Sequence, residues 1–205
     1  MTPDEYARAR RLLLRRDPVI ATLIRKHGAC GLAAAQRSDH FSALVQAITG
    51  QQLSTKAAST IYARLVALMP GGLTPQALAS LTDEQMRAVG MSRQKIAYFR
   101  DLAGKALTGA LPLDALDTMS DDEVIAALTQ VKGIGRWSAE MFLMFRLHRP
   151  DVLPVDDLGI VNAVKTVYRL RKRPTADRIR RIGEAWRPYR SVASWYLWRS
   201  LDNEP

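Results

Sequence analysis

Apolar residues recur every three or four positions along almost the whole chain, which is the spacing that places them on one face of an α-helix. One clear series has the spacing i, i+3, i+4 and i+7: Phe41, Leu44, Val45 and Ile48. The segment 137–147 is apolar on nearly every side, which predicts a central, buried helix. No segment has the strict alternation that is typical of a half-buried strand. We therefore predict an all-α fold with short loops.

Residues that cap or break helices divide this pattern into separate elements. The predicted N-caps are Asp17, either Ser38 or Asp39, Ser54, Ser92, Ser120, Thr175 and Ser191. Gly90 and Pro150 mark helix ends. The predicted helices cover residues 6–16, 18–27, 41–50, 55–69, 94–108, 124–129, 137–147, 159–168, 177–186 and 192–201, and shorter ones begin at Pro75 and Asp83.

The chain has 205 residues, enough to bury the core of one large domain or of two small lobes. Hydrophobic residues make up 47% of it, which indicates a globular rather than a disordered chain. Lys and Arg number 30 against 20 Asp and Glu, so the formal net charge is +10. Such an excess favours a polyanionic partner, either nucleic acid or an anionic membrane surface. The alternative is a basic surface that is simply solvated.

The cysteine and histidine content excludes several kinds of site. Cys30 is the only cysteine, so the chain can form no internal disulfide and no zinc or iron–sulfur site that needs several cysteines. The histidines His27, His40 and His148 show no metal-ligand spacing. The N-terminus has no basic region followed by an apolar run, and no apolar run approaches about 18 residues. We therefore expect no signal peptide and no membrane span, and a location in the cytoplasm at a bacterial nucleoid, or in a eukaryotic nucleus.

Two glycines, Gly133 and Gly135, stand on either side of one apolar residue just before a predicted helix. Glycine lets the backbone approach a ligand closely. The helix that begins near Arg136 directs its free N–H groups and positive dipole end at the same place, so a phosphate would fit there without a base-specific contact. The backbone carbonyls of Thr129, Val131 and Gly133 could also hold a monovalent cation, Na⁺ or K⁺. The alternative for two isolated glycines is an ordinary turn.

A longer string extends this signal. Residues 131–139 read V-K-G-I-G-R-W-S-A, and V-D-D follows at 155–157. Together they resemble the helix–hairpin–helix DNA glycosylase superfamily, and within it the AlkA-type 3-methyladenine DNA glycosylases. Three further strings carry the closer resemblance: F-x-x-L-x-x-x-I-x-x-Q-Q-L-S at 41–54, S-R-Q-K-I at 92–96 and W-R-P-Y-R-S-V-A at 186–193. The resemblance covers residues 17–199, nearly the whole chain.

The resemblance implies two helical lobes with the active site in the cleft between them. We expect one lobe over residues 36–150, with the hairpin at 129–139, and the other from residues 1–35 together with 151–205. The longest members of the family carry an additional N-terminal β-rich domain, for which this chain is too short. We therefore expect a compact form without that domain.

Asp157 lines up with the catalytic aspartate of the family. Cleavage of an N-glycosidic bond develops positive charge on the sugar, and a carboxylate beside C1′ would stabilise that charge and orient or deprotonate the attacking water. From the residues alone, Asp156 and Asp157 would merely cap the helix that starts at Gly159. With the resemblance, Asp157 is the expected catalytic acid and Asp156 a cap or a structural neighbour.

Trp137 stands where bifunctional members of the family hold a lysine that forms a Schiff base. Tryptophan cannot form one, so the resemblance implies a monofunctional enzyme that leaves an abasic site. It also makes Trp137 and Trp198 the expected walls of a base pocket, because a positively charged alkylated purine is attracted to aromatic faces. Met141 stands in this pocket where some relatives have an aromatic residue. The alternative for any single tryptophan is core packing.

A flipped base leaves a gap in the duplex that the protein must fill. The resemblance places this wedge at Gln52 or Leu53; alternatively, Gln51 caps a helix end and Leu53 packs in the core. Basic side chains and the hairpin should hold the phosphates, which gives affinity that falls steeply with salt. The expected phosphate contacts are Lys95, Lys132, Gly133, Gly135, Arg136, Ser138 and Arg190.

The expected function is that of a base-excision-repair enzyme. It would flip alkylated bases, of the 3-methyladenine or 7-methylguanine type, out of duplex DNA and hydrolyse the N-glycosidic bond. We expect a monomer whose partner is double-stranded DNA and which requires no cofactor. The alternative is a non-catalytic helix–hairpin–helix module that binds DNA or serves as a scaffold. The sequence leaves open which alkylated or deaminated bases are released.

Overall fold

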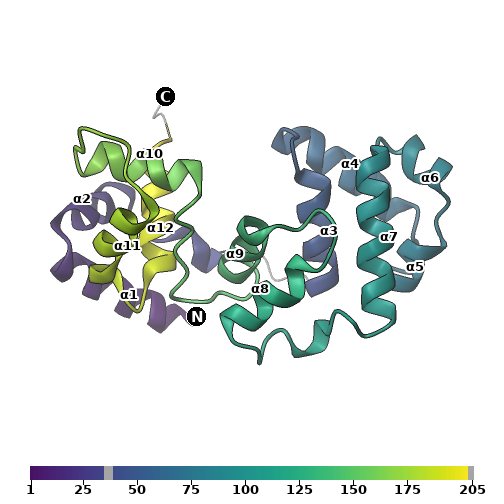
Figure 1. Ribbon diagram of the computed structural model, residues 1–205, viewed down its shortest axis with the longest axis horizontal. Helices are drawn as coiled ribbons and strands as arrows, with labels where there is room; N and C mark the ends of the chain where they lie inside the picture. Colours follow the sequence, from purple (N-terminus) through teal and green to yellow (C-terminus); the bar gives the residue numbers. More distant parts are fainter. Residues whose placement is uncertain (35–38, 203–205) are drawn as a thin grey trace. The chain divides into compact units, whose positions relative to one another are not determined.

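The computed structural model of the chain describes residues 1–34 and 39–202. Within these ranges the chain forms twelve α-helices and three short 3₁₀-helices, and it has no strand (Figure 1). The prediction of an all-α fold is therefore confirmed. No helix in the described ranges is long and apolar enough to cross a membrane.

The helices follow one another with short connections. The first half of the chain contains α1 (Pro3–Arg16), α2 (Pro18–His27), η1 (Gly31–Ala34), α3 (His40–Gly50), α4 (Thr55–Ala67), α5 (Pro75–Ser80), α6 (Asp83–Ala88) and α7 (Arg93–Leu107). The second half contains η2 (Leu113–Ala115), α8 (Asp121–Thr129), α9 (Arg136–Phe145), α10 (Leu158–Val167), α11 (Ala176–Gly183), η3 (Glu184–Trp186) and α12 (Arg190–Arg199).

Of the seven helices for which the sequence predicts an N-cap, six have their N-cap at that residue. Four predicted caps accept a hydrogen bond from the backbone N–H group three residues further on: Ser54, Ser92, Ser120 and Thr175. Asp39 caps α3, whereas Ser38, the other candidate, lies outside the described residues. The prediction that Ser191 caps the last helix is wrong, because α12 starts two residues earlier, at Arg190, with Tyr189 at its N-cap. The Ser191 hydroxyl instead accepts from the N–H of Val152 and donates to a carbonyl.

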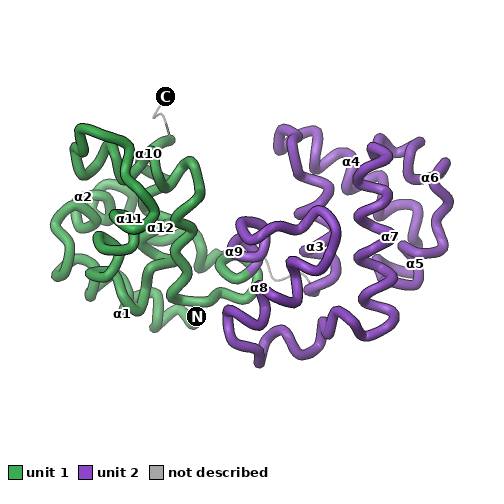
Figure 2. Tube along the Cα trace, in the orientation of Figure 1, with its two compact units in different colours: residues 1–36, 143–205 green, residues 37–142 purple. Residues whose placement is uncertain are grey.

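The chain divides into two compact units (Figure 2). One unit consists of residues 1–36 together with 143–205, and the other of residues 37–142. We call them unit 1 and unit 2. The later boundary falls inside α9, so this helix contributes its N-terminal part to unit 2 and its C-terminal part to unit 1.

The core of unit 2 is built on α3 and α7, against which α4 and α5 also pack. From α3, Leu44, Val45 and Ile48 are buried, as their helical spacing predicts. From α7, Phe99 and Leu102 are completely buried. Burial of each such side chain contributes about 1.5–3 kcal/mol, so the two helices are held firmly together. This packing brings the first turns of α7 to the C-terminal end of α3.

The core of unit 1 contains a buried carboxylate. Asp17 is 6% exposed, and its Oδ1 caps α2 by accepting from the N–H groups of Val19 and Ile20. Its Oδ2 accepts from the Tyr168 hydroxyl at 2.5 Å and from the Trp186 indole N–H at 2.8 Å. Burial, together with this neighbouring carboxylate, raises the pKa of Tyr168. The Asp17 carboxylate thus accepts from four neutral donors, two in α2, one at the end of α10 and one in η3, and it connects these three elements.

Helix α9 departs from the central, buried helix that its composition predicts. It ends at Phe145, two residues early, and only part of its surface is covered. Phe142 and Met144 are buried, but Trp137 is 51% exposed and Phe145 is 39% exposed. Large apolar side chains left at the surface are often places where another molecule binds.

Candidate functional site

The hairpin between α8 and α9 needs glycine at only one of its two glycine positions. Gly133 has φ +83°, and a Cβ added there would overlap the ring of Tyr98. Gly135 has no such φ, and a Cβ added there would meet nothing. Ile134 between them is 5% exposed and anchors the turn in the core. The hairpin is therefore rigid at Gly133, while Gly135 leaves the start of α9 open to a ligand.

Charged groups surround the hairpin. Lys132 is exposed, and its backbone N–H donates to Oδ2 of Asp101 at 2.8 Å. Partial burial alone would raise the pKa of Asp101, but the hydrogen bonds from Lys105 and Lys132 and their charges outweigh it, so that pKa is lowered. Arg136 is 63% exposed and pairs with Glu140 one turn further along α9. Ser138 is half-buried in the same turn. The predicted phosphate contacts Lys132, Arg136 and Ser138 thus lie together at the hairpin.

A polar hollow of about 500 Å³ lies beside Lys132. It is lined by Asp83, Arg93, Ile96, Ala97, Arg100, Asp101 and Lys132. The guanidinium group of Arg100 donates to the backbone carbonyls of Ala79 and Leu81, and it pairs with Asp83. The charges of Arg100 and of both acids in this hollow are therefore used within unit 2.

Lys95 has a different partner from the phosphate that the sequence predicts. Its ammonium group donates to the carbonyl of Thr49 at 2.7 Å and to that of Gln51 at 2.8 Å. Burial lowers the pKa of this side chain. Two of its three N–H donors are therefore used inside unit 2, at the end of α3.

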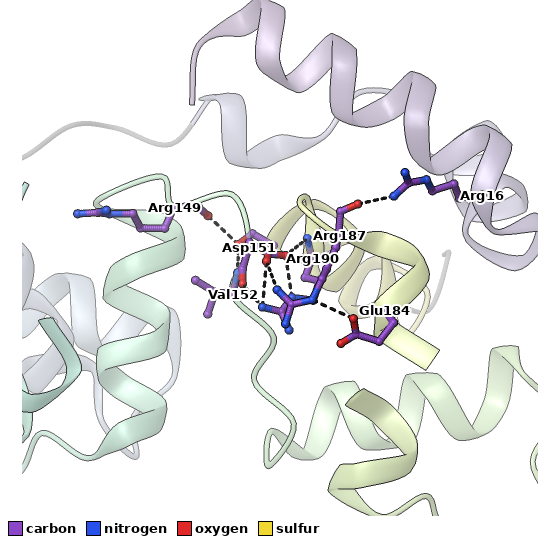
Figure 3. Close-up of polar contacts among 8 residues, drawn as sticks. Arg16, Arg149, Asp151, Val152, Glu184, Arg187 and Arg190 are labelled. Carbon is purple, nitrogen blue, oxygen red and sulfur yellow. Dashed lines mark hydrogen bonds and ion pairs between the residues drawn. The ribbon is translucent and has the colours of Figure 1, made fainter. Parts of the chain in front are cut away.

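Arg190 also differs from the prediction. Figure 3 shows its guanidinium group against Asp151: Nε donates to Oδ1 at 2.7 Å and Nη2 to Oδ2 at 3.0 Å. Nη2 additionally reaches the Asp151 carbonyl at 2.8 Å, and Arg187 donates to the same carboxylate at 2.8 Å. The Arg190 side chain is only 16% exposed. This bidentate pair leaves the guanidinium group little room for a DNA phosphate, so Arg190 has a structural partner that the sequence does not predict.

Asp157 is the N-cap of α10. Its Oδ1 accepts from the backbone N–H of Ile160 at 2.7 Å and from the indole N–H of Trp198 at 2.8 Å. The cap is thus Asp157 itself and not Asp156, which is exposed. Hydrogen bonds to an ionised carboxylate are stronger than those between neutral groups, so this side chain is held in one orientation.

Trp198, which donates to Asp157, packs against a second aromatic ring in unit 1. The ring of Trp198 stacks on Phe145, with centroids 6.0 Å apart and an interplanar angle of 26°. Gly159 lets the indole approach, because a Cβ there would lie 2.9 Å from the Trp198 ring. Leu158 is 58% exposed. The sequence pattern gives no sign that Phe145, Leu158 or Gly159 belongs to the site; helical period alone assigns Phe145 to the core.

In unit 2, the pocket candidates Trp137 and Met141 lie four residues apart on α9. This spacing places them on the same side of the helix. Trp137 is 51% exposed and Met141 is half-buried. The alternative that Trp137 packs in the core is therefore wrong.

The loop between α3 and α4 has an exposed tip. Gln52 is exposed with φ +59°, and Leu53 is 40% exposed, so the alternative that Leu53 packs in the core is wrong. Gln51 does cap the end of α3, as the same alternative proposes. Its side-chain amide also donates to the carbonyl of Gly133 at 2.8 Å. Both wedge candidates are therefore available at the surface.

The carbonyls predicted to hold a cation are partly used within the chain. That of Gly133 accepts from Gln51 and that of Val131 from the N–H of Ile134. Each carbonyl oxygen has two lone pairs, so one remains on each for a cation. Among the described residues, no group of three or more His, Cys, Asp or Glu side chains could hold a metal ion.

Comparison with known proteins shows the family to which the chain belongs. Residues 45–188 match the HhH-GPD superfamily base excision DNA repair proteins. DNA-3-methyladenine glycosylase 1 of Schizosaccharomyces pombe is 38% identical over 168 residues, which are 80% of this chain and 74% of that protein.

Two solved structures are similar over almost the whole chain. One is the Schizosaccharomyces pombe 3-methyladenine DNA glycosylase Mag1 in complex with abasic DNA, with a TM-score of 0.79 and 34% identity; the similarity covers 94% of this chain and 96% of that one. The other is a DNA-3-methyladenine glycosidase from Bacillus halodurans, with a TM-score of 0.83 and 37% identity; it covers 92% of this chain and 87% of that one. The chain therefore belongs to the HhH-GPD superfamily of base excision DNA repair proteins, among the 3-methyladenine DNA glycosylases.

Proposed function

We propose that this chain releases alkylated bases from duplex DNA by hydrolysing the N-glycosidic bond. The observation that carries the proposal is the carboxylate of Asp157, which is held by the Trp198 indole beside the exposed ring of Phe145. The names of the relatives, which are 3-methyladenine DNA glycosylases, support the same substrate class.

Asp157 would act on the sugar. As the glycosidic bond lengthens, positive charge develops on the sugar, and a carboxylate that is already oriented stabilises this charge without reorganising. The same group can orient or deprotonate the attacking water. The two donors to Oδ1, from Ile160 and Trp198, fix the carboxylate in advance, so its hydrogen bonds need not be rearranged during the reaction.

Aromatic side chains would bind the flipped base. Trp137 is 51% exposed and Trp198 is half-buried, and a cationic alkylated purine is attracted to the face of an indole ring. Phe145 supports Trp198 by stacking against it. Met141, on the same side of α9 as Trp137, would give a flexible apolar contact in place of a stacked ring.

The hairpin would hold the DNA backbone. The N–H groups at the start of α9, approached through Gly133 and Gly135, suit a phosphate, and Lys132, Arg136 and Ser138 lie around them. The remaining lone pairs on the carbonyls of Thr129, Val131 and Gly133 would hold a Na⁺ or K⁺ ion, which would add positive charge beside the phosphate. Gln52 or Leu53 would fill the gap left by the flipped base.

The proposed enzyme is monofunctional, because Trp137 stands where Schiff-base lysines occur in strand-cleaving relatives. We further propose that it acts as a monomer in the cytoplasm, or in the nucleus of a eukaryote, and that it requires no cofactor. The product is then an abasic site in an intact strand.

The test is the release of free base from a panel of alkylated duplexes, followed by mass spectrometry. We expect Asp157→Asn to release base at least about 100-fold more slowly than wild type, since it loses the catalytic charge. The same variant keeps an oxygen for the cap of α10, so its melting temperature should stay close to that of wild type. Asp156→Asn is the matched control and should retain activity.

Two results would overturn the proposal. One is the absence of base release by wild type from every duplex in the panel. The other is a rate for Asp157→Asn equal to that of wild type. Tight, salt-sensitive binding of duplex DNA without any base release would instead favour a non-catalytic DNA-binding module.

A further inference from the structure

Gln51, the first residue of the loop between α3 and α4, is held by hydrogen bonds to two separate parts of unit 2. The ammonium group of Lys95, on α7, donates to the backbone carbonyls of Thr49 and Gln51 at 2.7 and 2.8 Å. The side chain of Gln51 turns the other way and donates to the carbonyl of Gly133 at 2.8 Å. One residue, Gln51, is thereby bound to α7 through its main chain and to the hairpin through its side chain.

The position of Lys95 has a clear electrostatic reason. The last carbonyls of a helix have no partner within the helix and carry the negative end of its dipole. A cation at the end of α3 satisfies two of these oxygens. Lysine side chains are rarely buried away from water. Partial burial lowers the pKa of Lys95, so its hydrogen bonds to the two carbonyls must compensate for the lost hydration.

The residues that follow Gln51 stand free of the core. Gln52 takes a left-handed conformation with φ +59°, where the chain reverses. Gln52 is exposed and Leu53 is 40% exposed. The N–H of Leu53 donates to the carbonyl of Gly50 at 3.2 Å, which closes the turn. The exposed tip is therefore attached directly to an anchored residue.

We propose that Lys95 and Gln51 are positioning residues for base flipping. These two residues connect the exposed tip at 52–53 rigidly to the hairpin. When the hairpin binds a DNA phosphate, the position of the tip relative to the duplex is therefore fixed as well. This inference rests on the proposed function, because it takes the tip to be the element that fills the gap. Lys95 acts through the loop and does not touch a phosphate.

Two variants test the proposal from opposite ends of the connection. Lys95→Met removes the donor to both carbonyls at similar side-chain length. Gln51→Glu replaces the amide donor by a carboxylate that repels the carbonyl of Gly133. Arg87→Met is the matched control, because it removes one exposed positive charge from α6 in the same unit.

The substrates are two short duplexes that carry the same 7-methylguanine, either paired with cytosine or in a bulge where it has no partner. Extrusion costs least for a base that is already unpaired, so a badly placed tip should matter only for the paired base. We expect Lys95→Met and Gln51→Glu to slow single-turnover release from the paired duplex about tenfold. Release from the bulge should stay within about twofold of wild type. Arg87→Met should match wild type on both.

The salt dependence of binding supplies the second measurement. For a lost phosphate contact, the slope of log K against log salt concentration falls by about 1, as we expect for Arg136→Met. Lys95→Met should leave the slope unchanged. An equal loss of rate on both duplexes, or a slope reduced as for Arg136→Met, would overturn the proposal. If wild type releases no base from either duplex, the proposed function itself has failed, which is a separate outcome.

Discussion

The indole N–H of Trp198 donates a hydrogen bond of 2.8 Å to Oδ1 of Asp157, across 41 residues of sequence. This contact gives the tryptophan a role in addition to the base-stacking wall that the sequence predicts. Because this hydrogen bond joins the carboxylate to the indole ring, a substitution at either residue should change the position of the other side chain.

Replacement of Trp198 by phenylalanine separates the two roles. Phenylalanine keeps an aromatic face but cannot donate to Asp157, and a hydrogen bond to a charged group is worth about 1.5–3 kcal/mol. We expect kcat for base release to fall at least about tenfold, with KM nearly unchanged. Steady-state kinetics on a duplex with one alkylated base measure this. A kcat equal to that of wild type would show that the hydrogen bond contributes nothing to the reaction.

The two glycines of the hairpin should respond differently to alanine. Gly133→Ala forces a side chain into a left-handed conformation and against the Tyr98 ring, so we expect a loss of stability of about 1–3 kcal/mol. Gly135→Ala meets no atom and has no such backbone requirement, so its free energy of unfolding should stay within about 0.5 kcal/mol of wild type. Urea unfolding of both variants provides the comparison, and equal stabilities would contradict this account.

The pair between Arg190 and Asp151 should contribute to folding and not to DNA binding. Arg190→Met removes two hydrogen bonds to the partly buried carboxylate of Asp151 and one to the backbone carbonyl of the same residue. We expect the free energy of unfolding to fall by about 1.5–3 kcal/mol. A double-mutant cycle with Asp151→Ala should show that the two losses are not additive. The salt slope of DNA binding should not change; a slope lowered by about 1 would restore Arg190 as a phosphate contact.

The stability of unit 1 should fall at alkaline pH. Burial raises the pKa of the Cys30 thiol from 9.0 to about 12. Burial, and then the charge of Cys30, raises the pKa of Tyr196 from 10.0 to about 12. The folded state therefore holds more protons than the unfolded state in this range. The contribution of these two protonated groups to the free energy of unfolding is fully present below about pH 9, and it is lost as the pH rises towards about 12. Urea unfolding at a series of pH values measures the slope. Cys30→Ala should flatten it, and an unchanged slope would contradict the assignment.

The sequence by itself determined the helices and most of their beginnings. Caps such as Ser92 and Ser120 act on backbone groups three residues away, so the necessary information is local and does not depend on the rest of the fold. Gly133 could likewise be identified as a turn residue. The string at 131–139 carried the resemblance that led to the family.

Only the tertiary structure decided what the charged and aromatic side chains do. Arg190 meets Asp151 over 39 residues, and Gln51 meets Gly133 over 82. Periodicity reports which face of a helix is apolar, but it does not report which neighbour covers that face. Phe145 is exposed for this reason, although its position in an apolar helix predicts burial. A side chain's partner depends on which distant segments pack together, and that is settled by the burial of the whole core.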